Sequence, residues 1–328
     1  MKKTAIISLA LATLAMSAAR AQDAHFSQYD AAAIMLNPAH TGMFENNDFR
    51  VGSNLRNQWG RLGANFLTTA FAVDVSMQEK YGFGAYLNNY NMAGIVNTFQ
   101  TGVTAGYNVS KPKARHTLSA GVNLGLIYKK VNDSKLVWDA QYDRDHFNSD
   151  LPSGEDFRKA GRWMPDIGVG MAYRSKDPNR TVNPFANFAL FHVTMPDESI
   201  FREEKSRLPM RWSVNGGARI TIAEGTDLMP QALYMRQGPD QQIQAGMLGQ
   251  MSFWNNVYSV VAGASYRWHD AIIAQAGIKH GNNVYRISYD VNVSSLKQYT
   301  RSNGALEFSI VYYGTLSGRS RRVTSSAF

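Results

Sequence analysis

The residue types that most often carry enzyme chemistry are scattered along this chain. No two histidines have the i, i+4 spacing of a helical zinc site; they are His25, His40, His116, His146, His192, His269 and His280. The nearest approach to a hydrolase triad is Ser265, His269 and Asp270, but their spacing supplies no oxyanion hole. A strand end and its turn explain this grouping, and we predict a protein that is not an enzyme and has no catalytic residues.

The densest group of carboxylates lies in one stretch, at Asp139, Asp143, Asp145, Asp150, Glu155 and Asp156. Carboxylates this close can hold calcium, but the stretch lacks the glycine and the twelfth-position glutamate of an EF-hand loop. We interpret the stretch as a solvated loop, and we expect neither a bound metal nor a cofactor.

Residues 1–21 have the organisation of a secretory signal peptide. Lys2 and Lys3 precede an apolar run that is too short for a helical membrane span, and Ala19-Arg20-Ala21 supplies a small-residue cleavage site. The exported chain would begin at Gln22 with 31 basic and 25 acidic side chains. It has no basic stripe interleaved with aromatic residues, so we expect no nucleic-acid partner. It also has no cysteine, so hydrogen bonding and burial must stabilise it.

Apolar and polar residues alternate most clearly in residues 282–313, which predicts a long hairpin with two different faces. One face carries Tyr285, Ile287, Tyr289, Val291, Val293, Leu306, Phe308, Ile310 and Tyr312. The other carries Arg286, Ser288, Asp290, Asn292, Glu307 and Ser309.

The same period of two recurs along most of the chain. It predicts further strands at residues 48–59, 66–77, 82–92, 96–110, 116–129, 164–174, 184–194, 210–222, 226–237, 241–253, 257–268 and 271–279. The total is about fourteen strands, most of them longer than the ~5 to 6 residues usual in soluble sheets. A tilted strand needs ~9 to 11 residues to cross a bilayer.

A sheet can lie in hydrocarbon only if it closes, because unpaired backbone groups are costly there. The polar faces carry small residues and the isolated charges Asp74, Arg211, Arg219, Arg286, Asp290 and Glu307, which suit a lumen. A soluble double sandwich would carry denser charge and shorter strands. We therefore predict an all-β fold, a transmembrane antiparallel up-and-down β-barrel at residues 48–314, followed by a basic tail at 315–328. Short turns would face the periplasm, and the long connections near 131–163 and 195–209 would lie outside.

Residues 22–47 do not alternate. Ala31 to Ala33 begin a stretch that predicts one or two helical turns, ended by Asn37 and Pro38. Fourteen strands enclose a lumen wider than side chains alone can fill. We expect this segment to fold into the periplasmic mouth of the barrel as a plug.

Several motifs resemble the PorP/SprF family of type IX secretion system outer-membrane proteins. They are Phe26-Ser27-Gln28-Tyr29, Asn37-Pro38-Ala39 with Gly42, then Arg56, Gln58 and Trp59, then Gln141-Tyr142-Asp143 and Arg207-Leu208-Pro209, and finally Asp290, Ser295, Leu296, Gly304 and Glu307. The resemblance covers essentially the whole chain after the signal sequence.

The resemblance implies a non-enzymatic outer-membrane component of the type IX secretion system of Bacteroidetes, or of the linked gliding machinery. Such a barrel supports the secretion or surface attachment of cargo proteins, often adhesins, through their C-terminal domains, and it contacts periplasmic lipoproteins and outer-membrane lipid. We assign the cargo contact to the acidic loop, at Asp139, Tyr142, Asp143, Asp145, Asp150 and Glu155. The alternative is an outer-membrane channel or transporter for small or hydrophobic solutes, which needs the same barrel.

Overall fold

The computed structural model describes residues 23–44, 46–60, 65–111, 114–143, 146–154, 161–201, 205–254, 257–295 and 297–316. The expected signal peptide and all but the first two residues of the expected basic tail lie outside this part of the chain. Within it, no helix combines the length and the apolar composition of a membrane span.

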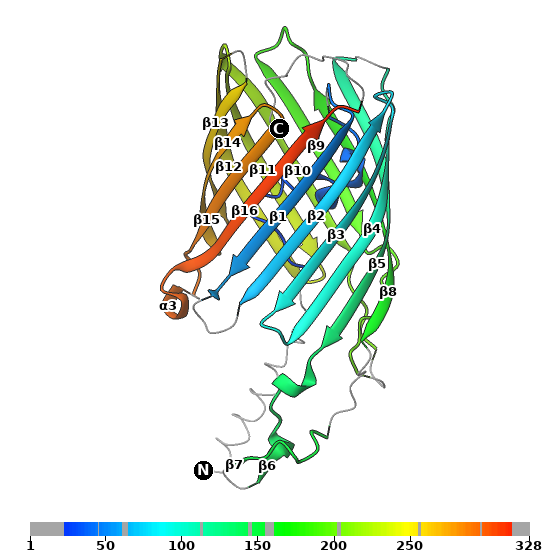
Figure 1. The fold of residues 1–328 in the computed structure, drawn as a ribbon, viewed down its shortest axis with the longest axis vertical. Helices are drawn as coiled ribbons and strands as arrows, with labels where there is room; N and C mark the ends of the chain where they lie inside the picture. Colours follow the sequence, from blue (N-terminus) through cyan, green and yellow to red (C-terminus); the bar gives the residue numbers. More distant parts are fainter. Residues whose placement is uncertain are drawn as a thin grey trace, which may run out of the picture.

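Fourteen long antiparallel strands form one closed barrel (Figure 1). In chain order they are β1 (Phe49–Gln58), β2 (Phe66–Met77), β3 (Tyr81–Met92), β4 (Val96–Asn108), β5 (His116–Val131), β8 (Arg162–Ser175), β9 (Val182–Phe191), β10 (Arg211–Ala223), β11 (Thr226–Gln237), β12 (Asp240–Phe253), β13 (Tyr258–Arg267), β14 (Ala271–His280), β15 (Asn283–Asn292) and β16 (Asn303–Gly314). Each strand pairs with the next one in this order, and β1 pairs with β16 from Phe49↔Gly314 to Gln58↔Ala305. The closed order confirms the predicted barrel and excludes the double sandwich.

The predicted strands are all present, and the predicted and observed strands differ only in where they begin and end. β9, for example, ends at Phe191 rather than at residue 194. His192 has a φ of 57° and Met195 a φ of 41°, values that interrupt an extended chain. The apolar residues that follow Phe191 therefore belong to a turn, although they continue the sequence pattern of the strand.

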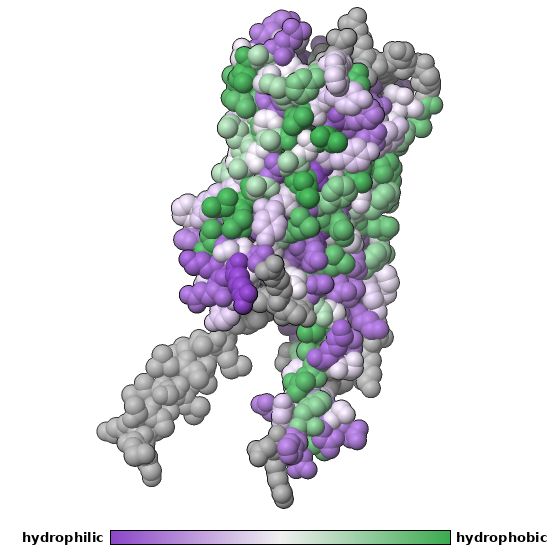
Figure 2. Space-filling view, turned by 60° about the vertical axis from the view of Figure 1, so that its left-hand side comes forward, coloured by the Kyte–Doolittle hydropathy of each residue, from purple (hydrophilic) through white to green (hydrophobic). Residues whose placement is uncertain are grey.

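The predicted faces of the strands are confirmed in the last hairpin. The side chains of Leu306, Phe308, Ile310 and Tyr312 point outward and are 36% to 51% exposed, whereas Glu307 and Ser309 are at most 1% exposed. Hydrophobic residues are likewise spread over the outer wall in the space-filling view, and hydrophilic residues gather at its upper end as well as in its lower part (Figure 2). A wall that is apolar outside and polar inside is the pattern of a barrel in lipid.

The barrel has two different ends. At the turn end, the upper end in Figure 1, short connections follow β2, β4, β8, β10, β12 and β14, and the chain enters β1 and leaves β16. At the loop end, residues 132–161 form the longest connection, and residues 192–210 form the next longest. Because outer-membrane barrels keep short turns in the periplasm, the turn end is expected to face the periplasm.

Exposed aromatic residues lie near both ends of the strands. Tyr81, Tyr107, Tyr258 and Tyr312 lie towards the turn end, and Trp163, Tyr266, Trp268 and Tyr289 lie towards the loop end. Aromatic girdles at both levels mark the two membrane interfaces of outer-membrane barrels.

Candidate functional site

Residues 23–44, 46 and 47, here called the N-terminal segment, lie inside the barrel, where Figure 1 shows them as a dark-blue chain behind the front strands. The segment extends from the loop end, where Asp23 contacts the ends of β9, β10 and β11, to the turn end, where Phe44 packs against Tyr313. It contains the short helices α2 (Ala33–Leu36) and η1 (Pro38–His40). As predicted, the helical turn ends at Asn37.

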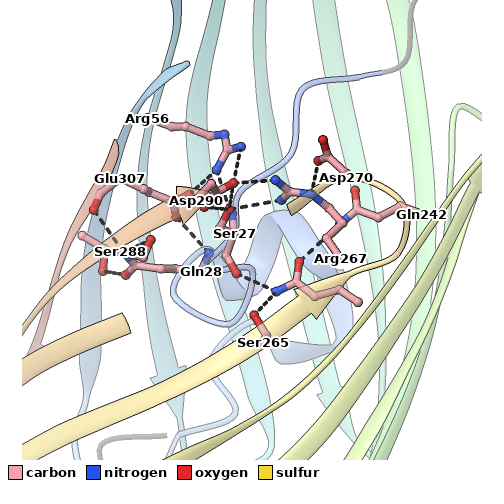
Figure 3. A network of polar contacts seen from close by, with 12 residues as sticks. Ser27, Gln28, Arg56, Gln242, Ser265, Arg267, Asp270, Ser288, Asp290 and Glu307 are labelled. Carbon is pink, nitrogen blue, oxygen red and sulfur yellow. Dashed lines mark hydrogen bonds and ion pairs between the residues drawn. The ribbon is translucent and has the colours of Figure 1, made fainter. Parts of the chain in front are cut away.

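The motif Ser27-Gln28 binds the inner wall through the last hairpin. The backbone N–H groups of Ser27 and Gln28 donate to the two carboxylate oxygens of Glu307, at 2.7 and 3.0 Å. The Gln28 side chain donates to Ser288 Oγ at 3.0 Å and accepts from Ser309 Oγ at 2.6 Å. All these polar groups are almost fully buried and satisfied by one another, so this turn of the segment is tied to β15 and β16 (Figure 3).

Two arginines complete this network. Arg56 of β1 donates to Asp290 at 2.9 Å and to Glu307 at 3.2 Å, and Arg267 of β13 also binds Asp290. Both arginines contact Ser27 Oγ (Figure 3). None of the four charged residues is more than 3% exposed, so two cations and two anions balance one another away from water. We call Ser27, Arg56, Arg267, Asp290 and Glu307 the anchor cluster.

The motif Asn37-Pro38-Ala39 fits into the wall where glycines leave room. The Asn37 amide donates to the carbonyls of Met171 and Phe188, both at 3.0 Å, which joins the segment to β8 and β9. A Cβ atom on Gly170 would lie 1.9 Å from Asn37 Oδ1, and one on Gly121 would lie 2.3 Å from the Pro38 carbonyl. Any larger residue at these wall positions would displace the segment.

The motif residue Gly42 is held near the turn end. Its N–H donates to Asp74 at 2.7 Å, and Asp74 also pairs with Arg50 at 2.8 Å. Gly42 has a φ of 69°, and its Cβ would lie 2.5 Å from Gly82 Cα, so both the backbone conformation and the space require glycine. Thr41 Oγ1 donates to Thr104 Oγ1 at 2.8 Å beside it.

At the loop end, Asp23 meets a buried histidine. Asp23 Oδ2 lies 2.6 Å from His192 Nε2 and accepts a hydrogen bond from Arg211 at 2.9 Å, while His192 Nδ1 lies 2.9 Å from Asp166. Burial disfavours the charged imidazole, but the carboxylates of Asp23 and Asp166 outweigh it and raise the pKa of His192 to about 9. His192 is therefore a cation at neutral pH, held between two carboxylates.

The other predicted motif residues pack around this segment or close the last hairpin. Phe26 contacts Ala32 and Ala70, and Tyr29 is buried. Gln58 ends β1, and the N–H of Trp59 donates to the carbonyl of Gly304. Ser295 lies in the connection after β15, and Leu296 lies outside the described residues.

The acidic loop is separate from the N-terminal segment. Asp139, Tyr142, Asp143 and Asp150 are exposed in and around the hairpin of β6 (Tyr142–Asp143) and β7 (His146–Phe147), beyond the loop end (Figure 1). Asp145, Glu155 and Asp156 are outside the described residues. Across the described part of the chain, no three His, Cys, Asp or Glu side chains are placed to share a metal ion.

The residues of the triad-like grouping contact different partners. Ser265 Oγ accepts from Gln244, Asp270 accepts from Arg267, and His269 is exposed in the turn after β13. Sequence analysis overlooked Arg267 and His192 as partners of the N-terminal segment. The alternation of β13 places Arg267 on the lumen-facing side, and this pattern could have identified it as a partner. No sequence pattern identifies His192, because it follows the last residue of a strand.

Several solved structures are similar to this chain in fold. They include the Ralstonia pickettii toluene transporter TbuX (13% identity, TM-score 0.53, covering 90% of this chain and 96% of that one) and the CymD monoaromatic hydrocarbon channel (11%, 0.51, 87% and 93%). The Pseudomonas putida toluene transporter TodX is similar at 10% identity, with a TM-score of 0.51 and coverage of 88% and 94%. Identities this low show the fold alone. No curated protein matches the chain.

The sequence itself matches one family model, over residues 18–312. That range includes the whole N-terminal segment and all fourteen strands except the last two residues of β16. The chain therefore belongs to the PorP/SprF family of type IX secretion system membrane proteins.

Proposed function

We propose that this protein is a non-enzymatic outer-membrane component of the type IX secretion system or of the linked gliding machinery. In this proposal it supports the secretion or surface attachment of cargo proteins, such as adhesins, through their C-terminal domains. The observation that carries the proposal is the anchor cluster, in which motif residues from both ends of the chain hold the N-terminal segment across the lumen. A barrel filled in this way is suited to binding partners at its two mouths.

The acidic loop is the proposed contact for cargo. Its exposed carboxylates and the aromatic pair of Tyr142 and Phe147 extend away from the barrel, at the end expected to lie outside the cell. Aromatic residues are enriched at protein interfaces, and the rim around them is polar. The turn end would face periplasmic lipoproteins of the same machine.

Deletion of this loop tests the proposal. Residues 139–156 would be replaced by a short Gly-Ser linker, and cargo would be measured on the cell surface and in the medium. We expect the barrel to insert normally, shown by heat-modifiable migration on a gel, while surface-retained cargo falls. A control that changes only Asp139, Asp143 and Asp150 to Asn separates the role of charge from that of loop length. Unchanged cargo retention in the deletion strain would contradict the proposed function as assigned to this loop.

A solute channel is the second candidate, favoured by the cavities on both sides of the N-terminal segment. A small cavity of about 60 Å³ near the loop end is lined by aromatic residues that include Phe26, Tyr86, Tyr90 and Phe191. A larger one, of about 570 Å³, lies towards the turn end. A channel would give steady conductance in planar bilayers, whereas the secretion component should stay mostly closed until the segment is released.

A further inference from the structure

The larger cavity is a basic chamber between the N-terminal segment and the turn end. Its floor is formed by the segment, at residues that include Tyr29, Leu36 and Phe44, and its walls are formed by lumen-facing side chains of the surrounding strands. Its volume of about 570 Å³ is in the range of pockets that bind specific ligands, ~300 to 1,000 Å³.

Cations outnumber acids among the described residues that line this chamber. Five arginines contribute: Arg50, Arg174, Arg180, Arg219 and Arg286. Lys176 and Lys279 add two more cations, against the two acids Asp30 and Asp177. When Asp74 and Asp227, which pair with Arg50 and Arg219, are included, seven cations still face four acids. Low-dielectric walls lined by one sign of charge concentrate ligands of the opposite sign.

The remaining lining suits a peptide better than a simple anion. Asn187, Asn215 and Gln231 offer amide groups that can both donate to and accept from a peptide backbone. Leu248 and Val284 add apolar surface on the same walls. A cavity that recognised only phosphate or chloride would not need these apolar side chains in its lining.

The chain's own C-terminal tail has the wrong charge for this chamber. β16 ends at the same mouth, and the sequence after it adds Arg319, Arg321 and Arg322. Repulsion between like charges disfavours the tail as the occupant.

We propose that this chamber binds an acidic, extended peptide segment of a periplasmic partner protein. The proposal rests on the proposed function for its cellular setting, because the turn end is the periplasmic mouth of such a component. The carboxylates of the partner would enter past Lys176 towards Lys279, and the N-terminal segment would limit how deep the peptide reaches.

A binding experiment with purified protein in detergent tests this inference. The probe is a fluorescein-labelled twelve-residue peptide of Glu, Ser and Leu, and its counterpart has Gln in place of every Glu. At low salt the acidic peptide should bind at least about tenfold more tightly than its counterpart, and added salt should weaken it. Equal binding of both peptides, or equally strong competition by inorganic phosphate, would overturn the proposal.

Matched variants locate the binding. The pair Lys176→Gln and Lys279→Gln should lower the affinity about tenfold, and Lys279→Arg with Lys176 intact should keep it. The pair Lys111→Gln and Lys297→Gln removes the same charge from exposed positions outside the chamber and should change the affinity less than about twofold. Equal losses in the two pairs would show that binding follows net charge and not the chamber.

The barrel that lacks residues 139–156 separates this inference from the proposed function. It should bind the acidic peptide as the full chain does, even where it fails to retain cargo. If cargo retention is unaffected by the deletion but the peptide binds, the proposed function fails and this inference stands. If the peptide does not bind but cargo is lost, this inference fails and the proposed function stands.

Discussion

Ser27 Oγ lies 2.8 Å from Asp290 Oδ1, although 263 positions of sequence separate the two residues. Ser27 belongs to the N-terminal segment, and Asp290 lies on the inner face of β15 next to the seam where β16 meets β1. Arg56 of β1 reaches across that seam to the same carboxylate. The segment is therefore tied to the strands that close the barrel, so barrel closure and segment docking depend on one set of contacts.

The first prediction concerns this coupling. Glu307→Gln leaves the buried Arg56 with one carboxylate fewer, and breaking a buried ion pair costs about 3 to 5 kcal/mol. We expect lower stability in denaturant and faster cleavage of the N-terminal segment by chymotrypsin. Trypsin is unsuitable because residues 22–47 contain neither lysine nor arginine.

A double-mutant cycle provides the control for Glu307. Arg56→Gln alone should destabilise the protein about as much, because the buried Arg56–Glu307 pair is lost and Asp290 keeps only its pair with Arg267. The double variant Arg56→Gln with Glu307→Gln should lose less than the sum of the single losses, since the two side chains share one contact. Additive losses would mean that the pair is not coupled.

The second prediction concerns the glycines that receive the Asn37-Pro38-Ala39 motif. In Gly121→Ala, the added methyl would lie 2.3 Å from backbone atoms of Pro38. Overpacking of this kind costs roughly 1 to 3 kcal/mol, and we expect it to loosen the N-terminal segment. Chymotrypsin cleavage at Phe26, Tyr29 and Leu36, followed by mass spectrometry, measures the change.

Gly249→Ala is the matched control for Gly121. Its added methyl would meet only Leu228 Cδ2 at 3.5 Å and a carbonyl at 3.7 Å, which are ordinary contacts. Its stability should change by less than about 0.5 kcal/mol, with cleavage as in the parent protein. Similar cleavage of both variants would show that the close approach at Gly121 does not hold the segment.

The third prediction concerns pH at the loop end. His192 is charged in the folded protein up to a pKa of about 9, against 6.5 for an ordinary histidine. Because folding raises this pKa, the charged contact makes its full contribution to the stability of the folded state below about pH 6.5. This contribution is lost as the pH rises through about 9. The protection of the amides of residues 23–29 from hydrogen exchange, measured against the intrinsic exchange rate at each pH, should therefore fall between pH 6.5 and 9.

Other histidines should not contribute to that transition. Burial, with neighbouring arginines, lowers the pKa of His25 and of His40 to about 3, so both stay neutral throughout. His192→Asn should abolish the pH dependence of this protection, while His116→Asn at the turn end should leave it intact. Protection that stays constant from pH 6.5 to 9 in the parent protein would contradict the charged contact between Asp23 and His192.

The fourth prediction concerns the outer wall. Phe308 is 42% exposed in the middle of β16, and Phe308→Arg should cost about 2 to 4 kcal/mol if that surface meets the bilayer midplane. Tyr312, near the turn end of the same strand, lies at the expected interface, where an arginine costs about 0 to 1 kcal/mol. Unfolding in lipid vesicles compares Phe308→Arg with Tyr312→Arg. Equal costs would mean that depth in a bilayer does not govern this face.

The sequence alone determined the number of strands, their approximate limits and the direction of their side chains. An alternation of period two is a local property of each strand. In a membrane barrel, the apolar positions of every strand face the lipid and the polar positions face the lumen, so the pattern has the same meaning in each strand. For that reason the lumen-facing positions of Asp290 and Glu307 could be predicted without knowing their neighbours.

Only the tertiary structure decided which of these lumen residues meet. The register between β1 and β16, and the path of the N-terminal segment from the loop end to the turn end, bring Ser27, Arg56, Arg267 and Asp290 together. Register and path depend on pairings between distant parts of the chain, which no local pattern records. The basic chamber has the same origin, because its cations come from seven positions that become neighbours only when the sheet closes around the segment.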